Sequence, residues 1–99
     1  MRNGLKPMYQ VNHSWLYGAV KPHFEKSGIK LLRDDMQFIE NCLGNVPPEF
    51  HRRVMKDYFT LWNTKVALKE NGSLNGINPR YEANVYLRNV SGNPETIDF

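Results

Sequence analysis

A long run of helical periodicity in the second half of the chain constrains the fold more than any other feature. From Pro48 to about Asn71, apolar residues recur at the 3.6-residue spacing of an amphipathic helix and occupy one half of the helical wheel. The residues on this half are Phe50, Val54, Met55, Tyr58, Phe59, Leu61, Trp62, Val66 and Leu68. In a chain of 99 residues, a helix of this length is the central element of the fold.

Two shorter helices are expected before it. The first lies within residues 12–27, where Ser14 can cap it. Pro22 must interrupt or restart this helix, because proline lacks an amide donor and disfavours helical backbone at the preceding residue. The second opens with the acidic pair at positions 34–35 as cap and first-turn carboxylate, and Gly44 is expected to stop it.

A fourth helix is expected after an exposed loop over residues 71–78. Asn78 suits the N-cap position and Pro79 suits the first helical position, so the helix begins there and runs to Gly92. The segment 93–99 shows no periodicity and is predicted to be a mobile C-terminal tail.

These patterns predict an all-α fold: one helical domain over residues 1–99, built as a small bundle of about four helices around a long central amphipathic helix. Cys42 is the single cysteine, which excludes an internal disulfide and indicates a reducing compartment. There is no apolar run of the roughly twenty residues that span a bilayer, nor an apolar N-terminal signal. We therefore expect a cytoplasmic protein without a membrane partner.

Motifs of catalysis and metal binding are not visible in the sequence. There is no phosphate-binding glycine loop, dinucleotide fingerprint or nucleophile elbow. His13, His23 and His51 are too scattered for a chelating pair on one helix and are interpreted as surface or half-buried histidines. The sequence predicts no catalytic residue, no metal site and no cofactor, so the protein is expected not to be an enzyme.

The first candidate binding group is Arg52, Arg53 and Lys56, three cations on the polar half of the long helix. Such a group could contact phosphates or an acidic protein surface. The alternative is a solvated face partly neutralised by Glu49 and Asp57, one turn away.

The second candidate group lies on the fourth helix, where Arg80, Asn84 and Arg88 form a polar, amide-rich surface. Guanidinium and amide groups bind base edges and the carbonyls of a protein equally well, so the residue types leave both uses open.

Three aromatic residues of the long helix also fit two uses. Tyr58, Phe59 and Trp62 could stack on nucleic-acid bases, but their helical spacing favours packing in the core. Cys42 lies near the C-terminal end of a predicted helix, where the dipole disfavours a thiolate, and is interpreted as a structural thiol.

Two stretches carry a resemblance to known proteins: Val46-Pro-Pro-Glu-Phe-His-Arg-Arg-Val-Met-Lys-Asp-Tyr-Phe, and Asn78-Pro-Arg-Tyr-Glu-Ala-Asn-Val-Tyr-Leu-Arg-Asn. They resemble helical modules of replication and recombination accessory proteins of temperate phages. The size and mildly basic character of the chain are also similar to those of phage modulators of host DNA enzymes, including anti-RecBCD proteins. The resemblance implies activity by binding, with no catalytic residues to carry over, and it departs from the acidic DNA mimics.

Two functional classes therefore compete. One is a modulator that binds a host DNA-processing protein, and the other is a small domain that binds DNA or RNA directly. A formal net charge of +3 and twelve aromatic residues favour the protein-binding class slightly. The oligomeric state is left open by the sequence.

Overall fold

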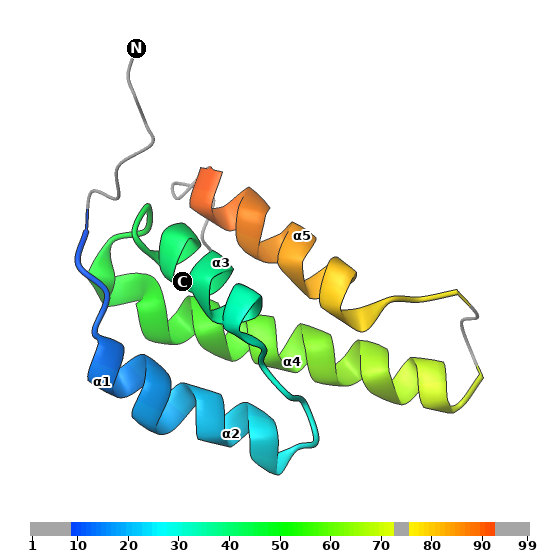
Figure 1. The fold of residues 1–99 in the computed structure, drawn as a ribbon. Coiled ribbons are helices and arrows are strands. Elements are labelled where there is room, and N and C mark those ends of the chain that lie inside the picture. Colours follow the sequence, from blue (N-terminus) through cyan, green and yellow to red (C-terminus); the bar gives the residue numbers. More distant parts are fainter. Residues whose placement is uncertain (1–8, 73–75, 93–99) are drawn as a thin grey trace.

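The computed structural model describes residues 9–72 and 76–92. In chain order its elements are α1 (His13–Trp15), η1 (Leu16–Val20), α2 (Lys21–Lys26), α3 (Arg33–Leu43), η2 (Pro48–Phe50), α4 (His51–Glu70) and α5 (Pro79–Gly92). Because α1, η1 and α2 follow one another without a break, they form a single rod, here called the N-terminal helix (Figure 1). The predicted all-α bundle of four helices is confirmed, with no strand in the described ranges. The predicted mobile tail, residues 93–99, lies outside them.

The N-terminal helix and α4 lie side by side, and α5 runs antiparallel along α4 (Figure 1). Between them the four helices enclose one hydrophobic core. Three aromatic rings occupy its centre: the Phe24 and Trp62 centroids are 6.0 Å apart, and the Tyr58 centroid is 5.6 Å from that of Trp62. The core interpretation of Tyr58 and Trp62 is thereby confirmed, because both side chains are almost fully buried. No helix of the described residues is long and apolar enough to cross a membrane.

Of the two outcomes predicted at Pro22, interruption or restart, the structure shows a restart: α2 begins at Lys21 with Pro22 in its first turn, and the chain of helical residues is not broken. Residues Leu16–Val20 form a π-helical turn, in which the backbone N–H of Lys21 bonds to the carbonyl of Leu16. This wider turn leads directly into Pro22. It accommodates a residue that has no backbone N–H to donate, so the N-terminal helix continues. The predicted cap also differs: the side chain of Asn12, not Ser14, accepts from the N–H of Trp15 at 2.9 Å.

Helix α3 begins close to the predicted acidic pair. Its N-cap residue is Leu32, whose backbone N–H donates to a carboxylate oxygen of Asp35 at 2.8 Å, while Asp34 adds a second negative charge in the first turn. The helix ends at Leu43, as predicted from Gly44. Gly44 itself has a φ of −64°, so the end does not use the left-handed conformation that favours glycine.

Helix α4 is confirmed over nearly the predicted range, but its buried stripe is narrower than half the wheel. The fully buried apolar residues are Val54, Met55, Tyr58 and Trp62. Leu61 and Leu68 fall on the predicted half but are only partly buried, because α4 projects past the N-terminal helix and α3 at its C-terminal end (Figure 1).

His51 is buried rather than exposed or half-buried. Its Nε2 lies 2.8 Å from the carbonyl oxygen of Leu43 and 2.7 Å from that of Val46. A protonated Nε2 donates to both oxygens, so the ring ties the end of α3 to the start of α4. Sequence spacing alone predicts His51 to be a surface or half-buried histidine. It is buried because its ring bonds to carbonyl groups between the two helix ends.

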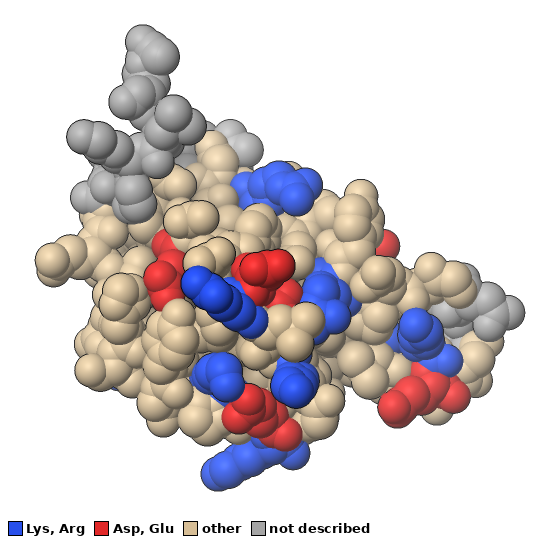
Figure 2. All heavy atoms as spheres, viewed as in Figure 1, with Lys and Arg blue, Asp and Glu red and all other residues tan. Residues whose placement is uncertain are grey.

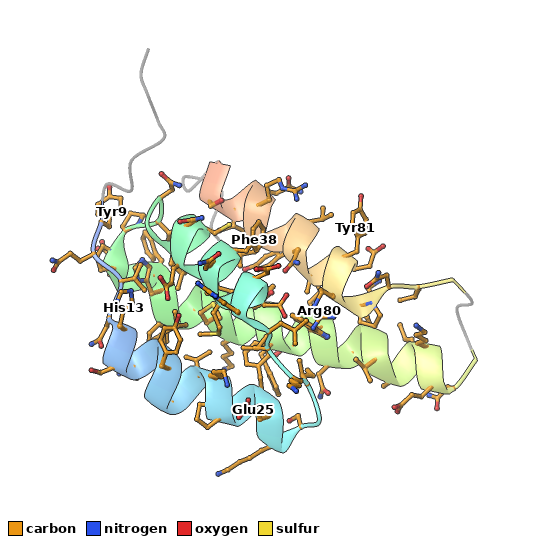
Figure 3. All side chains as sticks on the ribbon, viewed as in Figure 1. Tyr9, His13, Glu25, Phe38, Arg80 and Tyr81 are labelled. Carbon is orange, nitrogen blue, oxygen red and sulfur yellow. The ribbon has the colours of Figure 1, made fainter. Side chains whose placement is uncertain are left out.

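Helix α5 begins as predicted. The side chain of Asn78 accepts from the N–H of Tyr81 at 3.1 Å, and Pro79 occupies the first helical position. Its inner stripe of Ala83, Leu87 and Val90 is buried, whereas Tyr81 points away from the bundle (Figure 3).

Candidate functional site

A groove runs between the N-terminal helix and the first half of α4. Its volume is about 330 Å³. The lining residues are Trp15, Ala19, Val20, His23 and Phe24 from the first rod, and Arg52, Met55, Lys56 and Phe59 from α4. On both the N-terminal helix and α4, one stripe of residues is buried in the core. The stripe next to it is left uncovered, and these two uncovered stripes form the groove.

The floor of the groove is apolar and aromatic. Val20, Phe24 and Met55 are buried members of the core, while Trp15 and Phe59 are only partly buried. The Phe59 ring packs at 5.0 Å from the Phe24 ring. An apolar side chain entering the groove would therefore meet fixed ring surfaces and would remove them from water.

Two cations stand on the α4 side of the groove. Arg52 and Lys56 are four residues apart, so they lie one above the other on α4, and both are exposed. Within the part of the chain that the structure describes, no carboxylate is within ion-pair distance of either side chain. His23 on the opposite rod is also exposed, and its ring lies 4.4 Å from that of Phe59.

Arg53 does not belong to this group, although the sequence places it beside Arg52. Its Nε donates to Asp57 Oδ2 at 3.1 Å. One residue along a helix turns the side chain by about 100°, which carries Arg53 away from the groove. The same pair influences Tyr86 of α5. The pKa of Tyr86 is raised to about 12, mainly by burial and also by Asp57, while Arg53 opposes the rise. In the described structure, two cations of the predicted triad, Arg52 and Lys56, therefore have no carboxylate partner. The third, Arg53, is neutralised by Asp57.

Arg80 serves the fold rather than an open surface. Its guanidinium meets the buried carboxylate of Asp35, with Nε 3.0 Å from Oδ1 and a terminal nitrogen 3.0 Å from Oδ2 (Figure 3). A third bond reaches the carbonyl of Lys30 at 3.1 Å, and the guanidinium carbon lies 5.2 Å from the centroid of the Trp62 ring. These contacts join α5 to the start of α3.

Asn84 and Arg88 complete the predicted surface on α5, and the structure separates them too. The Oδ1 of Asn84 accepts from the hydroxyl of Tyr58 at 2.6 Å, so this amide satisfies a buried phenol. Arg88 is exposed, with its guanidinium 5.9 Å from the Phe38 ring. Arg80 and Asn84 thus make side-chain hydrogen bonds within the fold and are partly buried, whereas Arg88 is exposed.

The three histidines and Cys42 all lie within the described ranges. No group of three or more His, Cys, Asp or Glu side chains there could hold a metal ion. Burial raises the pKa of the Cys42 thiol, which fits the predicted structural role.

A second hollow, of about 500 Å³, lies between the N-terminal helix and α3. Its lining mixes the acidic Glu40, which accepts from the hydroxyl of Tyr17, with the basic Lys21, Lys30 and Arg33. Lys21 bonds Glu25, outside the lining, at 2.8 Å. On the face shown in Figure 2, basic and acidic side chains are interspersed rather than gathered into one basic surface. The groove beside α4 is therefore the better candidate site.

Comparison with protein-family models, with curated proteins and with solved structures finds no match for this chain. The site is therefore defined by its own geometry.

Sequence reasoning found one wall of the groove and missed the other. Arg52 and Lys56 were identified, but Trp15, Ala19 and His23 were not. A signal was present: these three recur every four residues, directly beside the buried stripe of Leu16, Val20 and Phe24. The expected interruption or restart at Pro22 concealed it, because it divided this stripe between two elements.

Proposed function

We propose that this protein is a non-catalytic binding protein that acts by contact with another protein through the groove beside α4. One observation carries the proposal: an open apolar floor of aromatic rings bordered by two cations, Arg52 and Lys56, that have no carboxylate beside them in the described structure. Protein interfaces are enriched in aromatic and arginine side chains of this kind.

Direct binding of DNA or RNA is the second candidate. Arg52 and Lys56 could contact phosphates while Trp15 or Phe59 stacks on a base. Against this, Asp57 neutralises Arg53, and the net charge of the chain is only +3. Two open cations give a weak field for a polyanion, whereas they are sufficient to orient one acidic segment of a protein.

The proposed partner is a host DNA-processing enzyme, with the protein acting as a phage-type modulator. This part of the proposal comes from the resemblance of residues 46–59 and 78–89 to phage accessory proteins. The first of these stretches supplies the whole α4 wall of the groove, from Arg52 to Phe59. One wall of the candidate site therefore lies within one of the two stretches that resemble phage accessory proteins.

Affinity capture from a nuclease-treated bacterial lysate tests the proposal when it is done with matched variants. The groove variant combines Arg52→Glu with Lys56→Glu. The control combines Arg33→Glu with Lys69→Glu, which makes the same change in charge at exposed positions outside the groove. We expect a DNA-processing enzyme to be captured by the natural protein and the control and to be lost with the groove variant.

Two results would contradict the proposal. Capture that both variants retain would show that the groove is not the contact surface. Capture that disappears when nuclease is added, together with sub-micromolar binding of purified protein to DNA, would place direct nucleic-acid binding first.

A further inference from the structure

We infer that the groove receives an amphipathic helix of the partner, with its apolar stripe on the aromatic floor and its carboxylates along the α4 side. This inference rests on the proposed function, because it specifies the segment through which the partner binds. Three features support it: the spacing of the lining residues, the position of the charges and the shape of the wall formed by the N-terminal helix.

The lining residues repeat at helical spacing on both sides. Trp15, Ala19 and His23 mark two turns of the N-terminal helix, and the α4 side continues from Arg52 to Phe59, also two turns. Two turns extend about 11 Å along a helix axis. Ridges of this kind on neighbouring helices form the surface into which a third helix packs, with its apolar residues at i, i+3 or i+4, and i+7.

The arginine and the lysine of the lining both stand on one side, which gives the bound helix an orientation. Arg52 and Lys56 are one turn apart, or about 6 Å along the axis of α4. A partner helix with two carboxylates one turn apart on one edge can match both cations at once. The facing positions Trp15 and Ala19 carry no charge, so the opposite edge of the partner has no ionic contact to make.

The wall formed by the N-terminal helix is low at its centre. The middle lining position on this wall is Ala19, which lies in the π-helical turn between the larger side chains of Trp15 and His23. Small side chains let two helix backbones approach closely. The turn thus offers room for a helix backbone, and π-helical turns occur often at functional sites.

Synthetic peptides test the inference. The first is a stapled helix of about 18 residues, long enough to stay folded when cross-linked, with a Leu stripe at i, i+3 and i+7 and two Glu one turn apart on one edge. In three relatives, both Glu are replaced by Gln, both are replaced by Lys, or both are moved to the face opposite the Leu stripe. A fifth peptide keeps the composition of the first and is made extended by proline. Fluorescence anisotropy gives their dissociation constants.

The expected order follows from the two cations. The Glu peptide binds most tightly, and replacement by Gln weakens it about tenfold, since two rim ion pairs contribute about that much. The Lys peptide is weaker still with the natural protein but gains affinity for the variant carrying Arg52→Glu and Lys56→Glu. The control carrying Arg33→Glu and Lys69→Glu binds like the natural protein.

The extended peptide, or the peptide with its Glu on the opposite face, binding as tightly as the first would overturn the inference. So would the absence of any rescue of the Lys peptide by charge reversal. Neither result touches the proposed function, which is judged separately by whether capture of a natural partner depends on the groove.

Discussion

The side chain of Arg80 joins separate parts of the fold. It connects α5 to the buried carboxylate of Asp35 and to the backbone at Lys30. The side chain of Asp35 is 6% exposed and that of Arg80 is 41% exposed, so removing the guanidinium leaves a nearly buried charge without its main partner.

Arg80→Ala is therefore expected to lower the free energy of unfolding by about 2 kcal/mol, a value below that of a fully buried pair because Arg80 is partly solvated. Urea denaturation followed by circular dichroism measures it. Arg88→Ala, which removes an exposed arginine from the same helix, serves as the control and should cost under about 0.5 kcal/mol. Equal costs for the two variants would show that the Asp35 contact contributes little.

Two tyrosines make the fold sensitive to alkali. Burial raises the pKa of Tyr86 to about 12 and that of Tyr58 further, from an ordinary value near 10. The folded state thus holds these protons more tightly than the unfolded state. The resulting stability is complete below about pH 10 and is lost as the pH rises through the folded pKa values.

The urea midpoint is accordingly expected to stay level between about pH 7 and 9 and to fall between about pH 10 and 12. Tyr86→Phe should reduce that fall, because the variant has one fewer phenol to ionise. A midpoint that declines as steeply in Tyr86→Phe as in the natural protein would assign the alkaline loss to other groups.

Residue types indicate local roles but not distant ones. Asn78 and Pro79 identify a helix start because both effects act within one turn. The partners of Arg80 and Asn84 lie 45 and 26 residues away, and no spacing rule connects them. That is why both were expected on an open surface, and why only the folded chain reveals the hydrogen bonds that they make with distant residues.

At the scale of the helices, two glycines with different backbone conformations offer a matched comparison. Gly18 lies in the π-helical turn, whereas Gly28 has a φ of +83° in the turn after α2. A Cβ atom would meet no neighbour within 4 Å at either position, so backbone conformation alone separates them.

We expect Gly18→Ala to raise the free energy of unfolding by about 0.5 kcal/mol, because alanine has less conformational entropy to lose. Gly28→Ala should lower it by about 1 kcal/mol, because an L side chain is strained at positive φ. Thermal denaturation of the two variants measures both changes. A loss of stability in both would indicate that the π-helical turn itself requires glycine.

The helices were predictable because apolar periodicity is a local property: α5 has its predicted ends, and α4 begins three residues after Pro48 and ends one residue before Asn71. The N-terminal helix was not fully predictable. Pro22 normally ends a helix, and nothing in residue order shows that the preceding turn will widen to accommodate it. The groove depends on this rod being continuous, and the expected break or restart at Pro22 hid that half of the candidate site.

At the scale of the whole molecule, the distribution of charge separates the two functional classes. The purified protein is expected to bind single- and double-stranded DNA with a dissociation constant weaker than about 1 μM at about 0.15 M salt. Replacing Arg52, Arg53 and Lys56 together by alanine should change that weak affinity little. Tight binding that falls with salt would instead indicate a nucleic-acid surface, provided that its logarithmic slope decreases by about 0.9 for each phosphate that this variant no longer neutralises.

The central claim, that the groove beside α4 is the binding surface, is tested most directly by the two tryptophan side chains. Trp15 lines the groove, while Trp62 is buried in the core and absent from its lining. Each contributes one indole N–H signal to a nitrogen-15 correlation spectrum. Titration with the Glu-bearing helical peptide should shift the Trp15 signal progressively and leave the Trp62 signal in place. An unmoved Trp15 signal at saturating peptide would contradict the account.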